Sequence, residues 1–171
     1  MVRDATVDDV HAIADVHVRA WQAAYRGFLP AQFLDGLSVA LREASWHTAL
    51  RDDGPQTLIL VAEDPPGSVI GFCCLALPSR DDDAGEHTVE IAATYVTPPR
   101  WDSGVGRALL MAAFDRLRGG DWADATLWVF RRNAHGRAFY ARLGFRLDGT
   151  MGVHEPSGAV TARMRASLPA S

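Results

Sequence analysis

Helical spacing dominates the first fifty residues of the chain. Thr6, with Asp9 three residues further on, is typical of a helix start, because the acidic side chain can accept a hydrogen bond from the backbone of the capping residue. One helical face then recurs at intervals of three and four residues, at Val10, Ile13, Ala14 and His17. The pattern predicts a first helix of about four turns that runs to Ala20 or beyond.

An aromatic cluster follows this helix. Its members stand just before Pro30 and suit a turn between two helices, with aromatic side chains that fill a surface hollow: Trp21, Tyr25, Phe28 and Leu29. Ser38 is expected to cap a second helix, whose apolar positions are Leu41, Ala44, Trp46 and Leu50. Residues 52–55 are expected to end that helix.

The rest of the chain alternates strand-like runs with helical periods. Residues 57–63 and 68–77 are apolar and β-branched, and Asp64-Pro65-Pro66-Gly67 between them is typical of a hairpin turn. Further strands are predicted at residues 89–96, 125–130 and 159–168, and further helices at residues 104–118 and 133–143. This order predicts an α/β (α+β) fold in a single domain, residues 1–171.

Charge and composition remove several classes of protein. The net charge of −4 argues against a nucleic-acid or anionic-membrane binder, since both need clustered positive charge. No run of eighteen apolar residues and no secretory signal is visible, so a cytoplasmic protein is expected. All 17 basic residues are arginine, which excludes chemistry that needs a lysine, such as a Schiff base or a P-loop.

Cysteine and histidine give no sign of a disulfide or a metal site. Cys73 and Cys74 are adjacent in a predicted strand, where they would point to opposite faces. The histidines are scattered rather than paired at ligand spacing, at positions 11, 17, 47, 87, 135 and 154. No metal is therefore expected, and the cysteines are interpreted as core residues rather than nucleophiles.

A glycine-containing loop is the most specific feature of the sequence. The strand that ends at Val96 is followed by Gly104-Val105-Gly106, which opens a helix. Glycine lets backbone N–H groups approach a phosphate closely, and a helix N-terminus offers free donors and a positive dipole end. Two glycines also occur in many ordinary turns. A dinucleotide fingerprint is excluded, because Leu109 occupies the position where it needs a small residue.

A second segment surrounds the last predicted helix. Asn133 is the only asparagine and lies at the junction of strand and helix, where its amide can cap the helix or hold a ligand. Tyr140 lies two helical turns later on the same face. From the residues alone, Tyr140 fits a core position as well as a catalytic one.

Together the two segments resemble the acetyl-coenzyme A motifs of the GNAT superfamily of N-acetyltransferases, bacterial type. The resemblance rests on Val96, the 104–110 run, Asn133, Phe139-Tyr140 and Gly144-Phe145, and extends to Trp21-Tyr25 and 69–72 near the N-terminus. It implies a central, mostly antiparallel mixed sheet that is splayed at the coenzyme site and flanked by helices. Coenzyme contacts are implied at Tyr95, Val96, Thr97, Trp101, Ser103, Gly104, Val105, Gly106, Arg107, Ala108, Asn133 and Tyr140.

One position departs from the family pattern. Trp101 stands three residues before the first glycine, where the family usually has Gln or Arg, and Asp102 adds an acid beside the cradle. Arg100 and Arg107 can offset the charge of Asp102. Backbone N–H groups provide most of the contacts to the pyrophosphate in this motif, so the chain is still expected to bind the coenzyme.

The resemblance implies direct acetyl transfer to an amine in a ternary complex, in a cleft beside the strand that ends at Val96. Tyr140 matches the family's tyrosine that protonates the leaving thiolate. A backbone N–H near Val96 is expected to meet the carbonyl oxygen. Glu90 is the candidate general base by its spacing, with Glu86 and the aspartates at 81–83 as rivals and an exposed strand glutamate as the alternative.

The acceptor is not identified by the sequence. Trp21, Tyr25, Arg26 and Phe28 lie where the family usually walls the amine site, although they suit the core or a homodimer surface equally well. A small-molecule amine, a peptide and a protein amine are all compatible. The alternatives are a non-catalytic acyl-coenzyme A-binding module and an antibiotic-modifying enzyme, for which the acidic loop at 81–83 would attract a cation.

Overall fold

The computed structural model of the chain describes residues 1–51, 56–65 and 67–168. Its helices are α1 (Val10–Ala24), α2 (Ala31–Asp35), α3 (Val39–Arg51), α4 (Val105–Arg116) and α5 (Ala134–Arg142), with 3₁₀ turns at Val7–Asp9 and Pro98–Arg100. Its strands are β1 (Val2–Asp4), β2 (Gln56–Asp64), β3 (Ser68–Leu77), β4 (Thr88–Val96), β5 (Asp124–Phe130), β6 (Arg146–His154) and β7 (Ala159–Ser167).

Both N-terminal helices begin at the predicted residues. The backbone N–H of Thr6 donates to the carboxylate of Asp9 at 2.8 Å, and the 3₁₀ turn there leads directly into α1. The hydroxyl oxygen of Ser38 accepts from the backbone N–H of Leu41 at 3.3 Å at the start of α3. The predicted end of this helix at 52–55 and part of the predicted hairpin turn, Pro66, lie outside the described residues.

The strands form one mixed sheet in the order β1-β2-β3-β4-β5-β7-β6. Among the strands of the described residues, β4 and β5 pair in parallel, and every other neighbouring pair is antiparallel. The predicted fold class is therefore confirmed: an α/β protein with a mostly antiparallel mixed sheet between helices.

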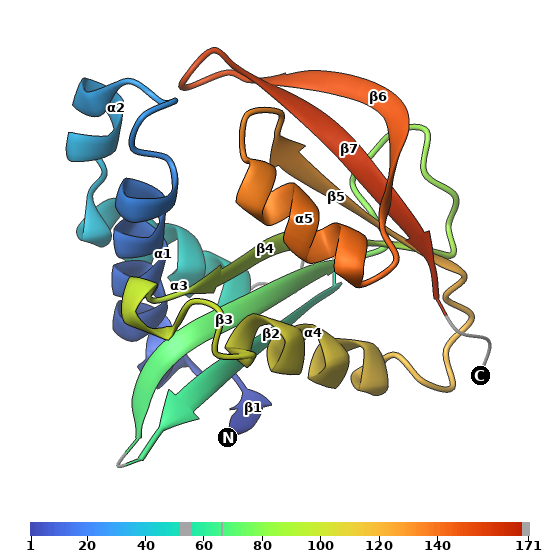
Figure 1. Cartoon of the computed structure of the whole chain (residues 1–171). Helices are drawn as coiled ribbons and strands as arrows, with labels where there is room; N and C mark the ends of the chain where they lie inside the picture. Colours follow the sequence, from blue (N-terminus) through green and yellow to red (C-terminus); the bar gives the residue numbers. More distant parts are fainter. Residues whose placement is uncertain (52–55, 66, 169–171) are drawn as a thin grey trace.

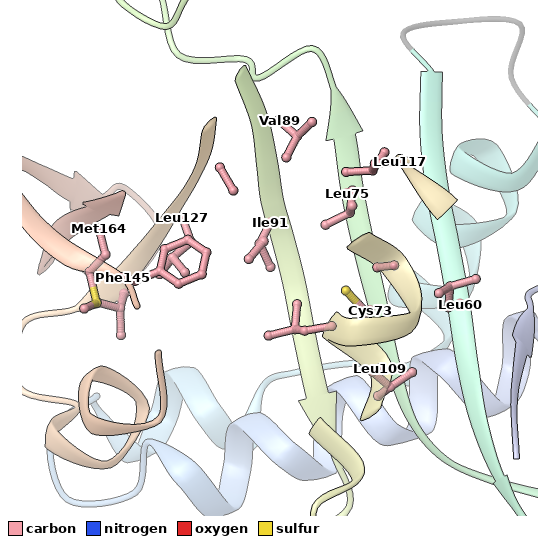
Figure 2. Packing of buried hydrophobic residues seen from close by; sticks show 14 of the residues in the cluster. Leu60, Cys73, Leu75, Val89, Ile91, Leu109, Leu117, Leu127, Phe145 and Met164 are labelled. Atoms are coloured by element: carbon pink, nitrogen blue, oxygen red, sulfur yellow. The ribbon is translucent and has the colours of Figure 1, made fainter. Parts of the chain in front are cut away.

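Helices cover the two faces of the sheet (Figure 1). On one face α4 packs over β2 to β4, and Leu109 and Leu117 join Leu75 and Ile91 in the main core cluster, drawn in Figure 2. On the other face α1 and α3 bury a second cluster. Cys73 belongs to the first cluster and Cys74 to the second, which confirms that the two cysteines point to opposite faces of β3.

The sheet splits in the middle. Pairing between β4 and β5 runs from Thr88↔Asp124 to Ile91↔Leu127 and goes no further. At that point the β3–β4 register steps from Leu75↔Ile91 to Cys74↔Ala93, so β4 carries one extra residue, Ala92. A bulge bends its strand and ends regular pairing. The remaining half of β4 therefore diverges from β5, as the resemblance to the GNAT superfamily implied.

Three elements were not predicted: β1, α2 and β6. β1 and α2 are short, and β6 is an edge strand with little burial, since Leu147, Met151 and Val153 are all exposed. An edge strand without a buried face lacks the alternation of apolar and polar residues that marks a strand in the sequence.

The helices of the described residues are too short or too polar for any of them to span a membrane.

Candidate active site

A cavity of about 860 Å³ follows the split between β4 and β5. Its walls come from α1, the second half of β4, the N-terminus of α4, the end of β5, α5, β6 and β7. Eleven of the predicted site residues line it: Trp21, Tyr25, Tyr95, Val96, Trp101, Gly104, Val105, Gly106, Arg107, Asn133 and Tyr140. The split thus brings together side chains from both halves of the chain.

The N-terminus of α4 forms one end of the cavity. Gly104 is its capping residue in the left-handed region, with φ of 87°, and no side chain caps the helix. The first N–H groups of a helix have no intrahelical acceptor, so they are available to an anion. Arg107, in the first turn of α4, lines the cavity there, and Arg142 of α5 lines it as well. The set fits a pyrophosphate group.

Gly106 has a second reason to be glycine. A methyl group at this position would lie 3.3 Å from the ring of Phe139 and 3.7 Å from Val96. The absent side chain therefore lets α4 approach α5 as well as a ligand.

The backbone of Val96 presents both its polar groups to the split. Thr97 donates its N–H to Ile70 of β3 at 2.8 Å, and successive backbone groups of a strand point to opposite sides. The N–H of Val96 therefore points away from β3, toward the missing partner. Its carbonyl oxygen accepts from the indole N–H of Trp101 at 2.8 Å. A donor remains at the split for a developing oxyanion.

Asn133 caps α5. Its side-chain oxygen accepts from the backbone N–H of Gly136 at 2.9 Å. A methyl group at Gly136 would lie 2.5 Å from the Asn133 amide nitrogen, so glycine is needed for this cap. Asn133 also lines the cavity, and the two roles left open by the sequence are therefore compatible.

Tyr140 faces the cavity from the second turn of α5. Its ring packs against Phe139 and Phe145, with centroids 5.0 and 5.9 Å away. Burial raises the pKa of the Tyr140 phenol, so the hydroxyl keeps its proton at neutral pH.

Aromatic rings build the opposite end of the cavity. Trp21, Tyr25 and Phe130 meet edge to face, with centroids 4.8 to 5.8 Å apart. The hydroxyl groups of Tyr25 and Tyr95 are 3.4 Å apart, and burial raises the pKa of both phenols. The side chain of Tyr95 therefore forms part of the aromatic end of the cavity and not of the end at α4.

Two histidines border the aromatic end. His154 of β6 lines the cavity between Trp21, Phe33 and Phe130, and its Nδ1 lies 2.7 Å from the hydroxyl of Ser157. His17 stacks on Tyr95, and its Nδ1 accepts from the indole N–H of Trp46 at 3.2 Å. Burial, and next the charge of Arg42, lower the pKa of both, that of His17 to about 3. Both rings are neutral at pH 7.

Sequence reasoning missed His154 and Phe130 as site residues. His154 was one of several scattered histidines, because β6 was not predicted and its register opposite Ala159 was unknown. Phe130 was interpreted only as the last residue of a predicted strand. A signal existed for Phe130 alone, since it ends the strand that precedes Asn133.

Glu90 does not line the cavity. It lies before the bulge at Ala92, is 5% exposed, and receives hydrogen bonds of 2.8 and 2.6 Å from the Arg80 guanidinium and one of 3.2 Å from the Arg80 backbone. A carboxylate held by three donors has few lone pairs left for a substrate proton. Its position therefore gives no support to the predicted role as general base.

Five further predicted residues lie outside the cavity lining: Arg26, Phe28, Thr97, Ser103 and Ala108. Arg26 is exposed and 3.7 Å from Asp35. Phe28 packs behind Tyr25 and Phe130. The Ser103 hydroxyl donates to the Arg100 carbonyl at 2.5 Å and shapes the loop instead.

Two carboxylates of the acidic loop bind an arginine of the protein itself. Asp81 and Asp83 bind the buried guanidinium of Arg163, Asp83 at 2.5 and 2.8 Å and Asp81 at 3.3 Å. Asp148 binds the same side chain at 2.6 Å. Asp81 and Asp83 therefore hold a buried arginine of the protein itself, and none of the residues 81–83 lines the cavity, so the loop gives no support to the antibiotic-modifying alternative.

The cysteines have the properties of core residues. Both are buried, and burial raises the pKa of each thiol to about 12. Neither lines the cavity. Within the described part of the chain, no three His, Cys, Asp or Glu side chains are grouped so that they could hold a metal ion.

Comparison with known proteins identifies relatives. A model of the acetyltransferase (GNAT) family matches residues 16–145. The uncharacterized N-acetyltransferase YuaI of Bacillus subtilis is 31% identical over 132 residues, which are 77% of this chain and 72% of that protein. The spermidine N(1)-acetyltransferase of Thermoplasma acidophilum is 20% identical over 153 residues, 88% of this chain and 91% of that protein.

Solved structures share the fold. The PaiA N-acetyltransferase of Thermoplasma acidophilum, in complex with coenzyme A, superposes with a TM-score of 0.80, covering 98% of both chains at 19% identity. YncA of Salmonella typhimurium, solved with acetyl-CoA, has a TM-score of 0.72, covering 100% of this chain and 95% of that chain at 24% identity.

Proposed function

Because the chain belongs to the acetyltransferase (GNAT) family and is an N-acetyltransferase that takes its acetyl group from acetyl-coenzyme A, we propose that it acetylates a small amine held at the aromatic end of the cavity. The observation that carries the proposal is the continuous cavity through the split sheet. The anion-binding helix N-terminus lies at one end, and the rings of Trp21 and Tyr25 at the other.

Acetyl-coenzyme A supplies an activated thioester. For its pyrophosphate we propose the free N–H groups at Gly104 to Arg107 and the positive end of the α4 dipole. The N–H of Val96 is suited to hold the carbonyl oxygen as negative charge develops there. Together these donors orient the carbonyl carbon toward the aromatic end.

Tyr140 is the proposed proton donor. When the amine nitrogen attacks the carbonyl carbon and the carbon–sulfur bond breaks, the sulfur leaves as a thiolate that needs a proton. The Tyr140 phenol stays protonated at neutral pH, and the burial that raises its pKa makes a thiolate in the same cavity more basic too. The proton then passes from the phenol to the sulfur.

His154 is the proposed proton acceptor in place of Glu90. A neutral imidazole whose Nδ1–H donates to Ser157 leaves Nε2 with a free lone pair. His154 lines the aromatic end, whereas Glu90 is bound to Arg80 outside the cavity. A proton released by the amine therefore has an acceptor on the same side as the amine.

The test pairs binding with turnover. Acetyl-coenzyme A should raise the melting temperature, since a ligand at a hundredfold excess over Kd stabilises the folded state by about 2.7 kcal/mol. Thiol release across a panel of amines should then exceed the hydrolysis without amine. No shift at millimolar coenzyme would refute the coenzyme site, and a shift with no amine-dependent release would favour the non-catalytic module instead.

Two further expectations stay predictions. A homodimer is testable by sedimentation, and the exposed apolar side chains Leu147, Met151, Val153 and Val160 of β6 and β7 give it a surface to use. A cytoplasmic location is testable by fractionation.

A further inference from the structure

The aromatic end of the cavity has no carboxylate in its wall. Among the described residues that line the cavity, Asp102 is the only acid, and it stands in the loop before α4, at the coenzyme end. Asp81 lies behind Trp128 and accepts its indole N–H at 2.8 Å, but the same carboxylate also binds Arg163. A second ammonium group on a substrate would find no counter-charge here.

The charge that does reach this end is positive. The Arg42 guanidinium of α3 lies 5.6 Å from the centroid of the Trp21 ring, and within the described chain no carboxylate forms an ion pair with it. After burial, its positive charge is the second cause that lowers the pKa of His17 and His154, and at Tyr95 it opposes part of the rise in pKa that burial causes. A positive charge beside a buried cavity disfavours a second cation there, because little water is present to screen the repulsion.

Aromatic rings alone would attract a cation, but one ring that lines the cavity and one ring packed behind it each already have an arginine nearby. Arg42 lies against Trp21, and Arg132 lies 6.0 Å from the centroid of Phe28, which packs on Tyr25. The cation–π attraction of Trp21 is therefore already directed in part to the protein's own Arg42, and a substrate ammonium near this ring would meet a like charge.

We infer that the acceptor is a monoamine with an apolar or aromatic body, and that polyamines are rejected by the charge of Arg42. This inference rests on the proposed function and narrows its substrate class. The same field favours the neutral form of the bound amine, which is the form that attacks the thioester. The relative named as a spermidine acetyltransferase would then differ from this chain in acceptor.

A matched pair of amines tests the inference. Hexylamine and 1,6-diaminohexane have the same length and differ by one ammonium group. In thiol release at pH 8, kcat/KM for hexylamine should exceed that for the diamine at least about tenfold, and 2-phenylethylamine should match or exceed hexylamine.

Two variants identify the source of the preference. Arg42→Gln should reduce the ratio to within about threefold, because it removes the field and keeps a long polar side chain. Arg26→Gln is the control, since Arg26 is exposed and its charge is offset by Asp35 at 3.7 Å, and the ratio in this variant should equal that of the wild type.

The outcomes separate the two proposals. If acetyl-coenzyme A gives no thermal shift, the proposed function fails. If the shift is present but the diamine is acetylated as well as hexylamine, or neither monoamine is acetylated, the inference is overturned and coenzyme binding stands. An unchanged ratio in Arg42→Gln would remove Arg42 as the cause.

Discussion

The indole N–H of Trp101 donates a 2.8 Å hydrogen bond to the carbonyl oxygen of Val96, on the edge of β4 that has lost its neighbour. Trp101 is the residue that departs from the family pattern, and this bond gives it a function. It ties the loop before α4 to the split strand. Asp102, with φ of 56°, and Gly104 turn the chain back toward the helix.

Replacing Trp101 with Phe should weaken acetyl-coenzyme A binding about three- to tenfold. The reason is that a net hydrogen bond is worth about 0.5–1.5 kcal/mol and the loop depends on this one. Kd is to be measured by calorimetry. Ser103→Ala is the control, since its hydroxyl bonds the same loop without lining the cavity, and equal losses in both variants would refute a special role for Trp101.

Tyr140→Phe should lower kcat by about two to four powers of ten and leave the Michaelis constant for acetyl-coenzyme A nearly unchanged. The ring that packs on Phe139 and Phe145 is retained, so the melting temperature should barely move. Tyr25→Phe removes a hydroxyl from the same cavity and should keep most of the rate. Full activity of Tyr140→Phe would exclude Tyr140 as the proton donor.

His154→Gln should lower kcat/KM by at least about a hundredfold and change its pH profile. In the wild type the rate should fall on the acid side, at a pH below the ordinary histidine pKa of about 6.5, because burial lowers the pKa of His154 and the protonated ring can no longer accept a proton. The variant should lack this fall, whereas Ser157→Ala should keep it. An unchanged profile in His154→Gln would show that another group removes the proton.

Glu90→Gln should reduce stability rather than chemistry. The carboxylate accepts three hydrogen bonds from Arg80, and a charge-assisted bond contributes about 1.5–3 kcal/mol. Turnover should stay within about threefold of the wild type, and Arg80→Gln should lower the melting temperature similarly. A hundredfold loss of rate at an unchanged melting temperature would restore Glu90 as the base.

His17 should make the protein sensitive to acid. In the folded state its pKa is about 3, against about 6.5 when unfolded, so below pH 6.5 the unfolded chain binds a proton that the folded chain does not. Stability therefore falls with pH, by about 2 kcal/mol between pH 7 and pH 5, and the loss ends near pH 3. Denaturant unfolding of His17→Asn, whose side-chain oxygen can still accept from Trp46, should show a smaller loss over this range. An equal loss would assign it to other groups.

The sequence alone determined the elements whose signal is local. Helix starts at Thr6 and Ser38 follow from capping side chains, β2 and β3 from apolar β-branched runs, and the Gly104 loop from the need for a left-handed residue. The residues of the proposed coenzyme end were named from the resemblance to the GNAT motifs, which was possible because one strand, one loop and one helix that follow one another in the chain supply most of this end.

Only the tertiary structure decided the acceptor end. His154, Phe130 and Trp21 are far apart in the chain and meet because β7 pairs between β5 and β6, a register that no local pattern encodes. The position of Glu90 outside the cavity depends on the bulge at Ala92, because the bulge sets where the sheet splits. Glu90 lies before the bulge, where β4 is still paired with β5, and it binds Arg80. The spacing of residues along a strand predicts which face of the sheet a side chain lies on, but it does not predict where the strand stops pairing with the neighbouring strand.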